Sequence, residues 1–283
     1  MLRAYLDTSV YDRIDKGQVP AEEIRALRTA LAHREVGAHL SLADVEELLG
    51  QWETDRPAAV RKLRLARDLV GFKGLLKPPA RLLAEAIQAY AVGAPPPSPT
   101  LPRDQRRYLA ACLEKVADGS TAFNSVVSGI VADVRRNKED FLAGMAESGE
   151  RTAAELNRSD AWQEAKRWAP TFDAFWAKAA PGWAEDFADR LGLADACRQR
   201  GLDGLLSVRT VRLSVGVALS LVFSQVLERR EPHRSDGYDL WHATLASVAD
   251  VFVTFDERLA GHLARVPVDD GFHVVTSLRA LLR

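Results

Sequence analysis

The distribution of apolar positions divides the chain into two ends that contain strand-like segments and a long middle with helical periodicity. Short apolar runs at residues 4–6, 37–41 and 251–253 have the length and the side chains of buried strands. Helical spacing of apolar residues follows them, so the pattern predicts an α/β fold made from both ends of the chain. In these ends the predicted helices cover residues 9–16, 21–33, 42–50 and a segment that begins at Asp239.

The middle of the chain, residues 55–230, contains no convincing strand. Its apolar spacing predicts helices at residues 57–70, 79–91, 105–117, 120–147, 152–168, 171–179, 183–191 and 210–229. Residues 93–102 (GAPPPSPTLP) form a proline-rich connector, because proline cannot continue a regular element. The sequence therefore predicts a first core segment at residues 1–54, an all-helical insertion at 55–230 and a second core segment at 231–283.

Charge is uneven along the chain although its sum is close to zero. The 283 residues are 47% hydrophobic and 27% charged, which is ordinary for a soluble globular protein, and the net charge is −1. Residues 55–107 carry eleven basic side chains against four acidic ones, so the remainder has a net charge of −8. Such polarity suits a protein that holds a metal at an acidic site and a polyanion at a basic wall. A solvated helical face is the alternative interpretation of these bases.

Several function classes are excluded by what the sequence lacks. The two cysteines, Cys112 and Cys197, are far apart and have no metal-ligand spacing, which fits a reducing cytoplasm and argues against a disulfide scaffold or a zinc cluster. Neither a secretion signal nor a membrane-spanning segment is recognisable, so we expect a cytoplasmic protein without a membrane partner. The absence of a nucleophile elbow and of a glycine-rich phosphate loop excludes serine hydrolases and nucleotide triphosphatases.

Acidic residues follow the predicted strands or lie on the helices beside them. Because the carboxyl ends of parallel strands meet at one edge of a sheet, these carboxylates are expected to converge. Mg2+ and Mn2+ prefer oxygen ligands and are held by only a few carboxylates, so the sequence predicts a site for one of these ions. The acids are Asp7, Asp239, Asp256 and either Glu46 or Glu47.

Each acid also has a structural alternative. Asp7 can cap a helix, Asp239 can be a favourable charge in a first helical turn, and Asp256 can be a turn residue. Their joint occurrence in this order favours the metal site over three separate structural roles. His242, one turn after Asp239, is interpreted as a structural histidine. Asp236 is interpreted as a cap or a spare acid that replaces Asp239 if the register is shifted by one turn.

Three segments of the chain resemble the signature regions of PIN domain nucleases, in the same order. They are YLDTSVYDRI at residues 5–14, LSLADVEELLG at 40–50 and DLWHATLASVADVFVTFDERL at 239–259. The resemblance implies a PIN-like three-layer α/β/α sandwich around a short parallel sheet, metal-dependent hydrolysis of phosphodiester bonds, and RNA as the commonest substrate. The large all-helical insertion departs from the small members of that family.

The resemblance also implies a role for individual residues. The catalytic and metal-binding acids fall on Asp7, Glu47, Asp239 and Asp256, where Glu47 is preferred to Glu46 because Leu48 follows it. Three hydroxyl residues would orient these carboxylates or a bound water, namely Thr8, Ser9 and Thr254. Three bases of the insertion would contact phosphates without reading sequence, namely Arg61, Arg64 and Arg67.

The function predicted in this way is hydrolysis of RNA by a ribonuclease with a four-carboxylate Mg2+ or Mn2+ site. The toxin half of a toxin–antitoxin pair, with an antitoxin-like protein partner, is one form of this hypothesis. The alternatives are a non-catalytic PIN-like scaffold that binds a protein or nucleic acid, and a structure-specific DNA nuclease. The sequence leaves open the oligomeric state, a homo-oligomer included, and the choice between endo and exo cleavage.

Overall fold

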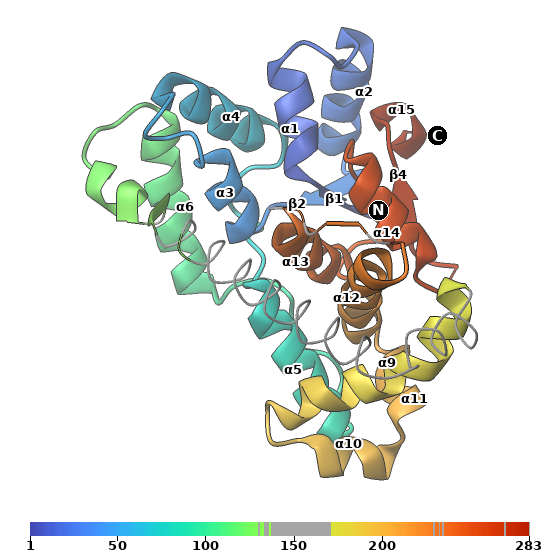
Figure 1. Cartoon of the computed structure of the whole chain (residues 1–283). Helices are drawn as coiled ribbons and strands as arrows, with labels where there is room; N and C mark the ends of the chain where they lie inside the picture. Colours follow the sequence, from blue (N-terminus) through green and yellow to red (C-terminus); the bar gives the residue numbers. More distant parts are fainter. Residues whose placement is uncertain are drawn as a thin grey trace.

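The molecule is organised around a parallel sheet at the meeting point of the two chain ends (Figure 1). The computed structural model describes residues 1–129, 131–132, 136, 171–228, 230–231, 233, 235–268 and 270–282. All neighbouring strands in the sheet are parallel, and Tyr5 is paired with both His39 and Phe252. The spatial order of the strands is β2 (Val36–His39), β1 (Leu2–Leu6), β3 (Val251–Val253) and β4 (His273–Val275). The chain is therefore an α/β protein, as the apolar pattern of its ends predicts.

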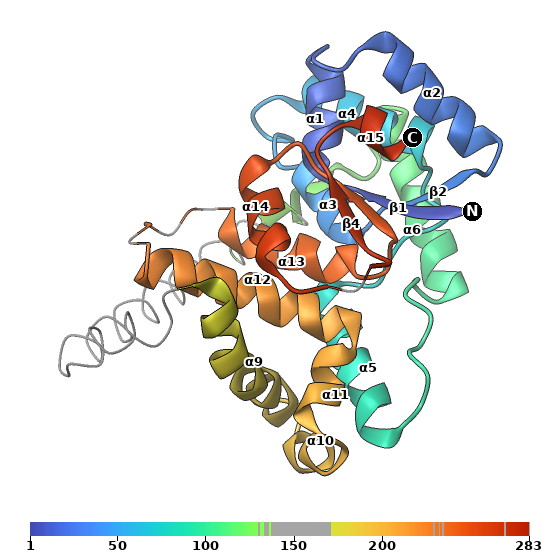
Figure 2. The same cartoon turned by 90° about the vertical axis from the view of Figure 1, so that its right-hand side faces the viewer.

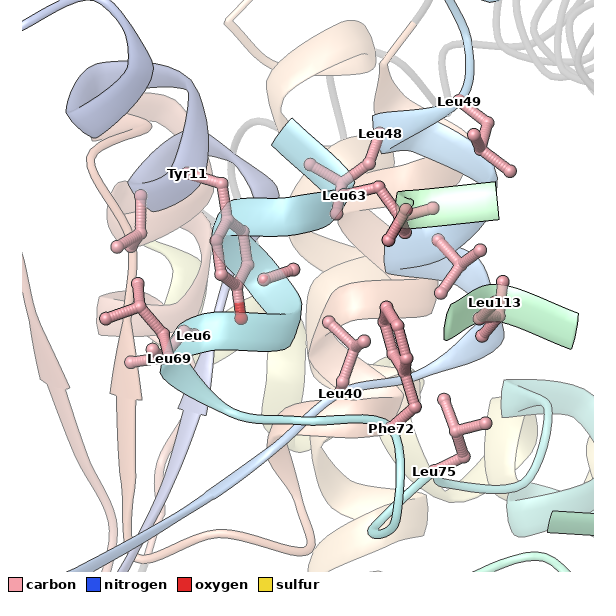
Figure 3. Close-up of a cluster of buried hydrophobic side chains, with 14 of the residues drawn as sticks. Leu6, Tyr11, Leu40, Leu48, Leu49, Leu63, Leu69, Phe72, Leu75 and Leu113 are labelled. Atoms are coloured by element: carbon pink, nitrogen blue, oxygen red, sulfur yellow. The ribbon is translucent and has the colours of Figure 1, made fainter. Parts of the chain in front are cut away.

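Alternating side chains of β1 face two different hydrophobic clusters, because successive residues of a strand point to opposite sides of a sheet. Ala4 and Leu6 lie in a cluster on one face, whereas Tyr5 lies in a cluster on the other. Figure 3 shows part of the first cluster, including Leu6 and Phe72. The helices of the first cluster are α1 (Thr8–Asp15), α2 (Ala21–Ala32), α3 (Leu42–Leu48), α4 (Arg56–Leu69), α6 (Arg103–Ala117) and α15 (Leu278–Leu281). The second cluster is covered by α12 (Arg209–Val226), α13 (Asp236–Ala246) and α14 (Glu257–Arg265).

A third cluster joins helices that lie away from the sheet (Figures 1 and 2). They are α5 (Pro79–Val92), α9 (Phe172–Asp189), α10 (Ala194–Arg200) and α11 (Leu202–Ser207), packed against α12. Helix α12 contributes to the second and third clusters and buries Val211, Leu213 and Val215 completely. Helix α12 is therefore a central buried helix. Helices α4 and α12, both in the segment assigned to an insertion, therefore pack in the same cores as the sheet.

Some predicted element boundaries are wrong. Residues 171–179 and 183–191 were expected to form two helices, but α9 continues through Pro181. Its buried residues Ala180, Ala184 and Ala188 keep helical spacing on both sides of the proline, and their packing outweighs the lost hydrogen bond. Helix α13 begins at Asp236 rather than at Asp239. The sequence did not predict the short elements α10, α11, β4 and α15, and the predicted helix at residues 152–168 lies outside the described residues, as does most of 120–147.

No helix among the described residues combines the length and the hydropathy that a membrane crossing requires.

Candidate metal centre

The acidic site lies at the point of the sheet where the strand order reverses: β2 lies on one side of β1, and β3 and β4 lie on the other. Strands β1 and β3 are neighbours, and the helices that follow them, α1 and α14, cover opposite faces of the sheet. In open parallel sheets this arrangement leaves a crevice beyond the carboxyl ends of the two strands. A cavity of about 400 Å³ occupies that position. Its lining includes the four acids to which the resemblance assigns catalysis, Asp7, Glu47, Asp239 and Asp256.

Asp7 follows β1 directly and is 3% exposed. Its Oδ2 accepts hydrogen bonds from the hydroxyl groups of Ser9 at 2.5 Å and Thr254 at 2.7 Å. The carboxylate makes no capping hydrogen bond to the described helix α1, although it precedes that helix. The capping alternative is therefore wrong for the Asp7 side chain. Ser9 and Thr254 fix the orientation of the carboxylate so that Oδ1 faces the centre of the site.

Glu47 reaches the same point from the last turn of α3. Its Oε2 accepts a hydrogen bond from Thr8 at 2.6 Å and lies 2.9 Å from Nε2 of His242. The same Nε2 is 3.5 Å from Oδ1 of Asp7. One ligand atom each from Asp7, Glu47 and His242 lies within 4.8 Å of the others, a grouping that can hold a metal ion. Glu46, the rival glutamate, is not among the residues that line the cavity.

His242 is buried at the centre of a polar chain that the sequence did not predict. Its Nδ1 is 2.9 Å from the hydroxyl of Tyr5, which donates to Oδ1 of Asp44 at 2.8 Å. Asp44 also accepts hydrogen bonds from the backbone N–H and the hydroxyl of Ser41, and it completes the capping box of α3. The Ser-x-x-Asp spacing before an apolar helix is the one local signal that marks Asp44.

Burial and charge shift the pKa values of this chain in a consistent way. Burial raises the pKa of Asp44 to about 6, although His242 and the hydrogen bonds from Ser41 oppose the shift. For His242, burial alone would lower the pKa, but Asp7, Glu47 and Asp44 outweigh it and raise the pKa to about 10. In the metal-free protein the imidazole is therefore a buried cation among three carboxylates.

Asp239 is a buried acid beside Arg258. It is 3% exposed, and burial raises its pKa to about 7 against the opposing charge of Arg258. Its Oδ2 lies 3.1 Å from Nη2 of Arg258, yet it accepts no hydrogen bond from any residue that the structure describes. Arg258 was not predicted; it also approaches Asp236, whose carboxylate accepts from Arg230 at 2.8 Å and from the His233 N–H at 2.9 Å.

Asp256 precedes α14 and also lines the cavity. Its Oδ1 accepts from the backbone N–H groups of Arg258 and Leu259 at 2.9 and 3.1 Å, so it caps α14. The side chain is also 37% exposed and lines the cavity, with Oδ2 3.9 Å from Arg258 Nη2. Of the four acids, Asp256 therefore has the side chain most exposed to solvent.

The three arginines predicted to contact phosphates are placed on α4 but engage other partners. Arg61 pairs with Asp15, Arg64 donates to the Ala117 carbonyl, and Arg67 pairs with Asp118. In the described part of the chain the cavity lining includes none of these arginines. It includes Lys62 of the same helix, whose Nζ is 2.5 Å from Asp12 and 3.2 Å from the Gln51 side chain.

The donor set fits a divalent cation. Carboxylate oxygens from Asp7, Glu47 and Asp239 line one cavity, and the buried Asp239 oxygen accepts no hydrogen bond from the described residues. A cation held by Asp7, Glu47 and His242 would relieve the mutual repulsion of the acids, and Asp239 lines the same cavity outside that group.

No protein-family model, curated protein or solved structure matches this chain. The class is therefore defined by fold and site alone. The chain is an α/β protein with a parallel sheet and, beyond the ends of β1 and β3, a buried acidic group that can hold a metal ion.

Proposed function

We propose that the chain is a metal-dependent nuclease with a PIN-like core, and that it hydrolyses phosphodiester bonds of RNA. The convergence of four carboxylates in one cavity at the ends of β1 and β3 carries this proposal. The acids come from residues 7 to 256, so their meeting is a property of the fold and not of a local charge run. The choice of RNA rests on the resemblance of three segments to PIN domain nucleases.

A bound Mg2+ or Mn2+ would supply charge stabilisation at the scissile phosphate and would lower the pKa of an attacking water. Asp7 is held by Ser9 and Thr254 so that one oxygen is directed to this cation. Asp239 presents a buried oxygen to the same cavity, and Glu47 is oriented by Thr8. Asp256, the most exposed of the four, would meet the entering water and substrate.

The substrate has a basic contact at the cavity wall. Lys62 lines the cavity, and its Nζ pairs with Asp12, which also lines the cavity and is 38% exposed. A phosphate group that approached the acidic centre would meet this ammonium group beside it. We therefore assign to Lys62 the phosphate contact that the sequence assigned to neighbouring arginines.

The proposal is tested by cleavage of labelled single-stranded RNA, structured RNA and DNA with Mn2+ or Mg2+. We expect metal-dependent cleavage by the natural protein and at least a ~100-fold loss in Asp7→Asn and Asp239→Asn at matched folding. The control is Asp15→Asn, which changes an acid of α1 that pairs with Arg61 away from the cavity. If the protein binds metal but cleaves none of these substrates, the non-catalytic scaffold replaces the nuclease as the proposed function. Cleavage of DNA alone would replace RNA by DNA in the proposal.

A further inference from the structure

The two nitrogen atoms of His242 face different surroundings. On the Nδ1 side lies the chain of hydrogen bonds through Tyr5 to Asp44, whose two oxygens already accept from Ser41 and Tyr5. On the Nε2 side lie two carboxylate oxygens, at 2.9 Å from Glu47 and 3.5 Å from Asp7. The ring is 2% exposed and lines the cavity.

The chain on the Nδ1 side determines which nitrogen carries a hydrogen atom. The Tyr5 hydroxyl has a single hydrogen atom, and it donates that atom to Asp44. Its oxygen must therefore accept from His242, so Nδ1 carries a hydrogen atom. The lone pair of a neutral imidazole is then on Nε2, directed at Glu47 and Asp7. Two acceptors and a lone pair repel one another unless a proton or a cation lies between them.

We propose that Nε2 of His242 binds the cation directly, together with Asp7 and Glu47, and that this nitrogen ligand makes the site select Mn2+ over Mg2+. The inference rests on the proposed metal site and names the ion and the ligand set of that site. Metal-bound histidines characteristically donate their other ring N–H to a partner that fixes the ring. Tyr5 and Asp44 have that position here, 2.9 and 3.7 Å from Nδ1.

The preference for Mn2+ follows from the ligand chemistry. Mg2+ is a small, hard ion that takes oxygen ligands and dehydrates reluctantly. Mn2+ also takes carboxylate oxygens, but as a first-row transition ion it accepts an imidazole nitrogen more readily than Mg2+ does. A site made of carboxylates alone would not distinguish the two ions in this way, so His242 is the specificity-determining ligand.

The first test is nitrogen hyperfine coupling to bound Mn2+, measured by pulsed electron paramagnetic resonance on the natural protein. We expect a directly bound 14N signal that changes to the 15N pattern when the histidines are 15N-labelled. The labelled natural protein needs no variant, so the result does not depend on how a substitution folds. Bound Mn2+ without nitrogen coupling overturns the inference and leaves the carboxylate site standing. Failure of Mn2+ to bind at all overturns the inference and the proposed nuclease together.

The second test compares the affinities for Mn2+ and Mg2+ by calorimetry. In His242→Gln an amide oxygen replaces the ring nitrogen, and we expect the ratio of Mn2+ to Mg2+ affinity to fall at least tenfold. The matched control is His273→Gln, the same change at an exposed histidine of β4, which should leave the ratio unchanged. In Tyr5→Phe the nitrogen coupling should persist while the Mn2+ affinity falls about 10–100-fold, because the ring loses its support. An unchanged ratio in folded His242→Gln would contradict the nitrogen ligand.

Discussion

Replacing Asp239 by asparagine is expected to remove catalysis and, in metal-free buffer, to stabilise the protein. The carboxyl group is buried, and burial raises its pKa to about 7 from a usual 3.8, although Arg258 opposes the shift. At neutral pH and above, folding must therefore keep a charge in a place that disfavours it. Asparagine has the size of the neutral acid and carries no charge, so Asp239→Asn relieves this cost.

The magnitude follows from the shift. A displacement of about three pKa units corresponds to about 4 kcal/mol in the free energy of unfolding once pH exceeds the folded-state value, at about 1.4 kcal/mol per unit. The sign is that of a raised carboxyl pKa. Below the unfolded-state pKa near 4 the Asp239 carboxyl is neutral in both states and does not lower the stability of the natural protein. As the pH rises to about 7, the natural protein loses stability because the unfolded state releases this proton more readily. We therefore expect the advantage of Asp239→Asn to grow by about 2 kcal/mol between about pH 5.5 and 8.5.

The assay is urea unfolding in the presence of EDTA at several pH values, for the natural protein and Asp239→Asn. Asp236→Asn is the matched control one turn earlier in α13, because Asp236 is equally buried but accepts from Arg230 and the His233 N–H. Loss of those charge-assisted bonds should destabilise it by about 1.5–3 kcal/mol. If Asp239→Asn were no more stable than the natural protein at high pH, or if the difference did not change with pH, the reasoning would be refuted.

The same experiment with Mn2+ links stability to function. Ligand at about 100 times its dissociation constant adds about 2.7 kcal/mol to a protein that binds it only when folded. The natural protein should gain this amount, whereas Asp239→Asn should gain less because the cavity that holds the ion loses one negative charge. An equal gain in both proteins would show that Asp239 does not contact the ion.

Three other substitutions have expected outcomes. His262 is buried, and burial and Arg230 lower its pKa to about 4. Between pH 7 and 5 only the unfolded state gains the proton, so in urea unfolding the natural protein should lose about 2 kcal/mol of stability relative to His262→Gln. A difference between the two proteins that does not change with pH would contradict this. Lys62→Gln should weaken substrate binding, measured by titration at several salt concentrations. It should also reduce by about 1 the slope of the logarithm of the binding constant against the logarithm of the salt concentration. Gly216→Ala should cost about 1–3 kcal/mol, since its Cβ would meet Val266 Cγ1, and Val266→Ala should restore part of that loss.

The strands and the acids beyond them could be predicted because their signals are local. Residues 4–6 and 251–253 are apolar runs that end at Asp7 and near Asp256, and each run is short enough to be a strand. Parallel pairing then brings the two acids to one edge of the sheet. The hydroxyl groups of Ser9 and Thr254 follow from the same register, since both donate to Asp7.

The surroundings of His242 could not be predicted, because its partners are far away in the sequence. Tyr5 is 237 residues from His242, and Glu47 is 195 residues from it. Nothing in helical spacing distinguishes a histidine that meets such partners from one that fills a core. The partners of the α4 arginines could not be predicted for a related reason. Basic composition shows that charge is present, whereas ion pairs such as Arg67–Asp118 decide whether it faces a ligand.

The site also connects the two ends of the chain. Asp7 and Glu47 belong to the N-terminal segment, whereas Asp239, His242 and Asp256 belong to the C-terminal one, and β1–β3 pairing brings the two segments together. A cation held between them would be bound only while that pairing is intact, because neither segment alone carries the ligand set. Stabilisation by the metal should therefore appear in the unfolding of the whole sheet, not as protection of a single loop. Hydrogen exchange at the amides of β1 and β3 should slow together on metal addition, by the same factor as global unfolding.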